Sequence, residues 1–130
     1  MSLEAYQERI LEHYKRPRNF GPLEGATATA RDVNTVCGDD ITLHLKVAAD
    51  GKIEDVRFQG RGCAISTASA SLLTEAIRGM PIEDALKIDR PFMEAQVRVP
   101  LKESQKRCMM LSSHVLHLAL GKGEKGKIEG

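Results

Sequence analysis

Residues 41–79 read ITLHLKVAADGKIEDVRFQGRGCAISTASASLLTEAIRG, and this stretch decides the fold. Apolar and polar residues alternate from Ile41 to Val47, which is typical of a strand with one buried face. Asp50-Gly51 is a strong turn signal, and alternation resumes from Ile53 to Gln59, so the two runs predict a β-hairpin. Apolar residues then recur at helical spacing from Ala64 to Arg78, which predicts a buried helix packed through small residues.

The flanking sequence completes an α+β domain. The same periodicities predict a helix over 3–15, a third strand over 28–33, one or two short helices over 82–97, and a long C-terminal helix over 103–120. We therefore expect a single domain over residues 1–120, in which a small antiparallel sheet of about three strands packs against helices. The glycine- and lysine-rich residues 121–130 are expected to form a flexible tail.

The composition excludes several classes of protein. The 130 residues include 19 Lys and Arg against 18 Asp and Glu, so charge alone would not drive binding to nucleic acid or to an anionic membrane. Trp is absent and Tyr and Phe are few, which disfavours RNA binding by aromatic stacking. No apolar run approaches the roughly 20 residues of a membrane-spanning helix. We expect a cytoplasmic protein that binds neither nucleic acid nor membrane.

The three cysteines lie at junctions between the predicted elements. Cys37 precedes the first strand of the hairpin, Cys63 lies where the second strand meets the buried helix, and Cys108 lies near the start of the last helix. An odd number of cysteines does not form a closed set of disulfides, and cytosolic thiols stay reduced. Thiolates beside glycine and near helix N-termini favour a shared cation site, because their mutual repulsion requires a positive charge.

Asp39 is the natural fourth ligand, because residues two apart in an extended chain project to the same side. Three cysteines and an aspartate form a workable set for zinc or for iron–sulfur chemistry, and Arg107 is a candidate to offset the resulting negative charge. We leave the four histidines out of this site. At about 100° per residue, His114 and His117 point away from Cys108, and His44 and His13 are assigned to polar faces.

The residues alone leave other interpretations open. Unrelated buried thiols are the more usual reason for three scattered cysteines, because the chain has no paired CxxC motif and its spacing is not that of a zinc finger, so the residues alone give only a weak metal signal. Asp39 is also a candidate turn cap, a role that Asp40 would fill as well. Arg107 is also typical of a solvated helix face.

Several motifs together resemble the IscU/SufU/NifU N-terminal family of iron–sulfur cluster assembly scaffolds. They are, in chain order, Leu11-Glu12-His13-Tyr14-Lys15-Arg16-Pro17-Arg18-Asn19, Cys37-Gly38-Asp39, Gly60-Arg61-Gly62-Cys63-Ala64-Ile65-Ser66, Ala68-Ser69-Ala70-Ser71 and Arg107-Cys108. The resemblance covers about residues 3–120.

The resemblance implies a scaffold rather than an enzyme. Such a protein accepts sulfur as a persulfide from a PLP-dependent cysteine desulfurase, binds iron, builds a transient [2Fe-2S] cluster and passes it to apo-proteins or carriers. The ligands implied are Cys37, Asp39, Cys63 and Cys108, with Cys37 or Cys108 as the persulfide acceptor. Zinc is expected in the isolated protein, which would be a monomer when empty and able to dimerise when loaded.

Three departures place the chain between the IscU and SufU branches. Arg107 stands where IscU-type members usually carry histidine, and a basic residue there resembles SufU. The insertion usual in SufU between the second and third cysteines is absent, however, as in IscU. The Leu-Pro-Pro-Val-Lys motif through which IscU meets an Hsp70 chaperone is replaced by Val99-Pro100-Leu101-Lys102. The alternative functions are a zinc-dependent, SufU-like sulfurtransferase that holds no cluster, and an interaction module with structural zinc.

Overall fold

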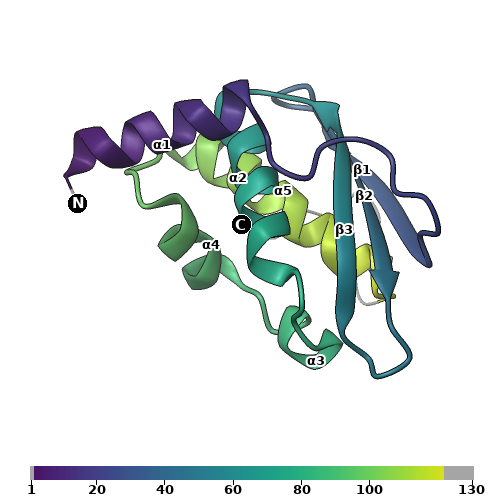
Figure 1. Cartoon of the computed structure of the whole chain (residues 1–130). Coiled ribbons are helices and arrows are strands. Elements are labelled where there is room, and N and C mark those ends of the chain that lie inside the picture. The colour runs from purple at the N-terminus through teal and green to yellow at the C-terminus, as the bar shows by residue number, and fades with distance from the viewer. Residues whose placement is uncertain (1, 122–130) are drawn as a thin grey trace.

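A computed structural model describes residues 2–121, and its element order confirms the predicted α+β class (Figure 1). The elements are, in chain order, α1 (Leu3–Lys15), β1 (Ala28–Asn34), β2 (Asp39–Val47), β3 (Ile53–Arg61), α2 (Ala64–Ile77), α3 (Ile82–Ala85), α4 (Arg90–Val97) and α5 (Glu103–Ala119). The predicted tail over 121–130 lies outside the described residues except for Gly121. No helix in the described part of the chain combines the length and apolar character needed to cross a membrane.

The three strands form one antiparallel sheet in the order β1-β2-β3. Asn34 pairs with Asp39 across the first hairpin, and Asp40 pairs with Arg61 on the other side of β2. Helix α5 packs against β1 and β2, while α2 packs against β3 and against α5 (Figure 1). The apolar residues that alternate along the sequence therefore lie on the face of the sheet that packs against the helices, and the polar residues lie on the other face.

The core is aliphatic, as the composition requires. The fully buried side chains include Leu43, Leu45, Val56, Leu73 and Leu111, contributed by both sides of the helix–sheet interface. Ala68, Ser69, Ala70 and Ser71 of α2 are buried as well. Small side chains allow α5 to lie close to α2, and this packing brings Cys108 to the sheet.

The helix predicted over 3–15 is confirmed as α1, but the sequence did not predict that His13 is buried. Leu3 and Tyr14 are 49% and 43% exposed, whereas Ile10 and His13 are the buried residues. His13, which we assigned to a polar face, places Nδ1 2.7 Å from Ser71 Oγ of α2. The polar side of α1 therefore packs on hydroxyl groups of α2, an arrangement that hydrophobic periodicity does not report.

Burial, followed by the charge of Arg18, lowers the pKa of His13, and burial also lowers the pKa of His117. The unfolded chain then binds protons that the folded chain lacks. The stabilisation is present above the ordinary histidine pKa of about 6.5 and is lost as the pH falls towards the folded-state pKa.

We therefore expect the free energy of unfolding to fall between pH 7.5 and 5.5, and to fall less steeply in His13→Asn. Asparagine keeps a polar atom near Ser71 but does not titrate. Urea denaturation at several pH values measures both slopes. Equal slopes in the two proteins would contradict this role of His13.

Candidate metal centre

Cys37 lies in the short loop 35–38 between β1 and β2. Asn34 fixes both sides of this loop, because its carbonyl accepts from Gly38 N–H at 2.8 Å and its Oδ1 accepts from Val36 N–H at 3.2 Å. Gly38 has φ +72°, a conformation that favours glycine. The Cys37 thiol is half-buried, and the neighbouring Val36 side chain is 75% exposed. The loop thus presents Cys37 near the surface at one end of the sheet.

Asp39 begins β2 and is only 1% exposed. Its Oδ1 accepts from the Cys63 N–H at 2.9 Å, while its Oδ2 is buried without a hydrogen-bond partner. Asp40 points to the other face, where Arg31 binds it with two hydrogen bonds of 2.8 and 2.7 Å and lowers the pKa of its carboxyl. The inward carboxylate available to a ligand is therefore that of Asp39.

Cys63 and Cys108 reach the same region from two helices. Cys63 is the N-cap of α2, and its exposed Sγ accepts from Ser66 N–H at 3.4 Å. Cys108 lies on the second turn of α5 and is 3% exposed, with its thiol directed to the Ser104 carbonyl at 3.4 Å. Four separate segments therefore supply the four residues singled out in the sequence.

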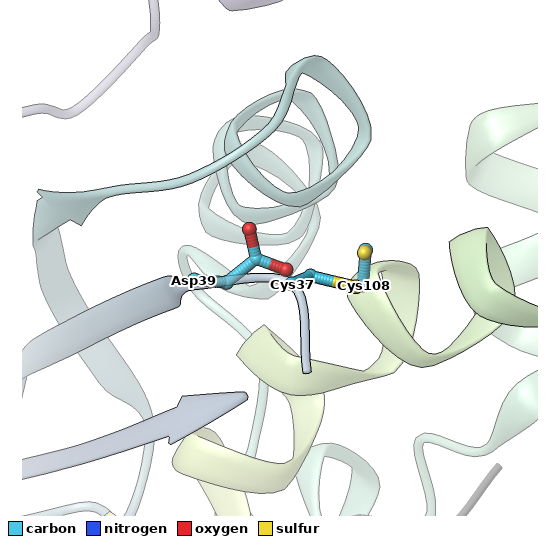
Figure 2. A group of neighbouring side chains, drawn as sticks. All are labelled: Cys37, Asp39 and Cys108. Atoms are coloured by element: carbon cyan, nitrogen blue, oxygen red, sulfur yellow. The ribbon is translucent and has the colours of Figure 1, made fainter. Parts of the chain in front are cut away.

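The ligand atoms of Cys37, Asp39 and Cys108 all lie within 4.8 Å of one another (Figure 2). Bonds of about 2.0–2.3 Å to zinc place tetrahedral ligand atoms roughly 3.3–3.8 Å apart, so a small closing movement would bring the three atoms onto one ion. Cys63 lies beside this group and contacts Cys108 closely enough to affect its ionisation, but its Sγ is not within 4.8 Å of all three atoms. The buried, unpartnered Asp39 Oδ2 fits a metal ligand.

The electrostatics of the site favour a cation. Burial, the Asp39 carboxylate, and the thiols of Cys37 and Cys63 all raise the pKa of the Cys108 thiol above its usual range. The Cys108 thiol resists ionisation because its negative charge would be buried beside a carboxylate and two further sulfurs. A bound divalent cation removes this obstacle and stabilises the thiolates that ligate it.

The structure also shows the surroundings of Arg107 and of the histidines that were left out of the site. Arg107 is exposed, and it acts after Lys106 and Arg90 among the cations that lower the pKa of Glu103. His114 Nε2 lies 3.2 Å from Asp32 Oδ2, and a ring nitrogen of His117 lies 3.2 Å from the Ala85 carbonyl. His44 bonds Thr29 and Gln59 on the half-buried face of the sheet. The role of Arg107 beside the metal ligands stays a prediction.

Sequence reasoning missed Gly62 as a residue that shapes the site. A Cβ at this position would lie 2.5 Å from Asp39 Oδ1 and 3.0 Å from Ser66 Oγ. The chain between β3 and α2 therefore passes against the Asp39 carboxylate with no room for a side chain. The Gly60-Arg61-Gly62 segment before Cys63 was the available signal, because glycine beside a cysteine permits close backbone approach.

The fold and the site define a small α+β protein that brings thiols and a carboxylate from separate segments into one cluster that could hold a metal ion. A family model described as the NifU-like N terminal domain matches residues 5–128. The chain belongs to this family, whose relatives include proteins named IscU and SufU.

Two relatives represent these two names. IscU 1 of Archaeoglobus fulgidus, an iron–sulfur cluster assembly scaffold protein, is 37% identical over 115 residues, which cover 88% of this chain and 74% of the relative. The zinc-dependent sulfurtransferase SufU of Bacillus subtilis is 44% identical over 89 residues, or 68% of this chain and 59% of the relative.

A solved structure shares the fold. It is described as a candidate iron–sulfur cluster assembly scaffold protein for the SUF system from Fervidobacterium islandicum. It matches with a TM-score of 0.72 and 27% identity, over 92% of this chain and 99% of the other.

Gly62→Ala should weaken metal binding, because its Cβ displaces the Asp39 carboxylate. Overpacking of this kind costs about 1–3 kcal/mol of stability. The matched control is Gly25→Ala, where φ is +78° and the nearest atom to the new Cβ is 4.0 Å away. The control should lose stability through backbone strain but retain zinc affinity, measured by competition with a chelator. Equal zinc affinities in the two variants would contradict the role of Gly62.

The three thiols of the metal-free protein should alkylate in the order Cys63, Cys37, Cys108, following their exposure. Cys108 should react more than about tenfold more slowly than Cys63, because each unit of raised pKa lowers the thiolate fraction about tenfold. Mass spectrometry of peptides after timed iodoacetamide treatment gives the three rates. Fast modification of Cys108 would show that the thiol is not buried in solution.

Proposed function

We propose that this chain is an iron–sulfur cluster assembly scaffold. In this function, it accepts sulfur from a cysteine desulfurase, a PLP enzyme, binds iron, holds a transient [2Fe-2S] cluster as its cargo and transfers it to apo-proteins or carriers. The cargo ligands are Cys37, Asp39, Cys63 and Cys108. The single observation that carries the proposal is the buried, unpartnered Asp39 Oδ2 packed against two thiols.

A mixed set of soft and hard ligands suits a site that must release its cargo. Thiolates hold iron–sulfur clusters, whereas a carboxylate is the poorer ligand for such iron. A thiolate of the recipient protein would therefore displace the Asp39 carboxylate first, because it is the weakest ligand. Residues 1–120 carry this activity in our proposal, 121–130 form a tail, and the reduced thiols fit the cytoplasm.

For sulfur acceptance, we favour Cys37 over Cys108. A thiolate of this chain attacks the terminal sulfur of the donor's persulfide, so that a new S–S bond forms, the donor's S–S bond breaks and the donor cysteine leaves as a thiolate. Cys37 is half-buried in a loop, whereas Cys108 is almost fully buried on a helix. Cys63 is exposed, but its sulfur caps α2, which supports a role as ligand.

A second candidate is a zinc-dependent sulfurtransferase. The resident zinc would be held by the same four residues and would keep the thiolates ionised at neutral pH. The identity with the Bacillus SufU protein and the basic Arg107 beside Cys108 support this alternative. In this case, the chain would carry a persulfide but no cluster.

The two functions separate in the visible absorption spectrum of metal-stripped protein incubated anaerobically with iron, cysteine and a cysteine desulfurase. A sulfide-to-iron charge-transfer spectrum that is lost in Cys37→Ser, Cys63→Ser and Cys108→Ser supports the scaffold. A colourless protein that carries persulfide only after zinc is restored supports the sulfurtransferase. Colourless protein without persulfide contradicts both.

Asp39→Ala should keep the fold and retain the cluster longer. Removal of one negative charge from a site of formal charge near −2 reduces repulsion among the remaining ligands, and it removes the weak ligand that a recipient's thiolate would displace. We expect transfer to an apo-ferredoxin to slow about tenfold, which corresponds to ~1.4 kcal/mol in the barrier. A variant that loses metal and unfolds would show instead that Asp39 is structural.

A further inference from the structure

A set of buried polar atoms in the described residues lacks hydrogen-bond partners. These are Asn34 Nδ2, Asp39 Oδ2, Ser66 Oγ, Ser69 Oγ, Arg90 Nε and Ser112 Oγ. An unpartnered buried polar atom costs about 1–3 kcal/mol, so each requires an explanation. Three of them, on Asn34, Asp39 and Ser66, gather at the metal centre.

Asn34 and Ser66 both lie near the Asp39 carboxylate. Asn34 is paired directly with Asp39 across the β1–β2 hairpin, so their side chains are neighbours on one face of the sheet. The position of a Cβ on Gly62 is 2.5 Å from Asp39 Oδ1 and 3.0 Å from Ser66 Oγ, so the hydroxyl lies beside the carboxylate. Two buried donors thus lie near a buried acceptor, and Asn34 Nδ2, Ser66 Oγ and Asp39 Oδ2 all lack a hydrogen-bond partner.

Ser66 also borders the sulfur of Cys63. Its backbone N–H donates to Cys63 Sγ at 3.4 Å, while its hydroxyl remains unpartnered and its side chain is 1% exposed. Asn34 holds the Cys37 loop through its carbonyl and Oδ1, which leaves its Nδ2 protons free. Each free donor therefore belongs to a residue that already contacts a cysteine or its loop.

A metal-loaded site would carry negative charge that these donors could offset. Three thiolates and a carboxylate around a divalent cation carry a formal charge of about −2. No lysine or arginine is among the buried side chains of residues 2–121, and Arg107 is exposed. Neutral hydrogen-bond donors are suited to offset the part of this charge that lies on the buried Asp39 and Cys108, and such donors are known to tune metal-bound sulfur.

We propose that the Ser66 hydroxyl and the Asn34 amide donate hydrogen bonds to anionic sulfur when a metal occupies the site. They are positioning residues for metal-bound thiolate, persulfide or sulfide, and their donor protons offset the excess charge. This inference rests on the proposed function only in requiring a thiolate-ligated metal at the site.

The test uses Ser66→Ala with Ser69→Ala as the matched control. Ser69 is a buried serine on the same helix with an unpartnered hydroxyl, one turn further from Cys63. Anaerobic titration of the metal-free full chain with Co²⁺ reports thiolate ligation through the sulfur-to-cobalt charge-transfer band. Ser66→Ala should bind about 10–100-fold more weakly and shift this band to lower energy, since a thiolate without its donor gives up charge more easily. Ser69→Ala and Ser66→Thr should match the wild type.

Urea denaturation of the metal-free proteins separates positioning from structure. Removal of an unsatisfied buried hydroxyl leaves the empty fold as stable or more stable, so Ser66→Ala should lose Co²⁺ affinity without losing stability. Asn34→Ser retains a hydroxyl to cap Val36 N–H, and it should also weaken Co²⁺ binding and shift the band.

Two results would overturn the inference. One is wild-type affinity and spectrum in Ser66→Ala. The other is a loss of Co²⁺ affinity in Ser66→Ala that is accompanied by an equal loss of metal-free stability. A wild-type chain that binds Co²⁺ with no thiolate charge-transfer band would overturn the proposed function as well as this inference, so the two failures are distinguishable.

Discussion

The hydrogen bond from Cys63 N–H to Asp39 Oδ1 joins the start of β2 to the start of α2, and it sets how the candidate ligands are arranged. This hydrogen bond uses Oδ1 of the Asp39 carboxylate and leaves Oδ2 directed into the candidate site. It also requires β3 and α2 to meet without a side chain at Gly62. A single contact therefore fixes the orientation of one ligand and the position of another.

Helices α2 and α5 bring the remaining candidate ligand, Cys108, to the site. The small residues of α2 let α5 pack closely, and α5 in turn covers β1 and β2, which sets Cys108 beside Asp39. Ligands drawn from a loop, a strand, a helix cap and a helix body meet only when the whole domain has folded. The site is consequently a property of the tertiary structure, and no short motif contains it.

Much of the fold follows from local sequence, whereas the site does not. The alternation in 41–47 and 53–59 and the Asp50-Gly51 turn predicted the hairpin, because strand faces and turns are local properties. The burial of His13 was missed, since this side chain is matched to the hydroxyl of Ser71, which lies 58 positions away in the chain. Cys37 and Asp39 were linked by their spacing in an extended chain, but the spacing of Cys108 gave only weak support for a shared site, and the family resemblance supplied the rest. The flanking Asn34 and Ser66 carried no signal as site residues, because asparagine and serine are ordinary at turns and helix starts.

The dispersal of the ligands over four segments has a consequence for the lifetime of the protein. A cation that binds only the folded arrangement stabilises the whole domain by mass action, and its departure withdraws that stabilisation everywhere at once. Proteases act on transiently opened chains in proportion to their population. A chain that holds such a cation will thus be degraded more slowly than an empty one.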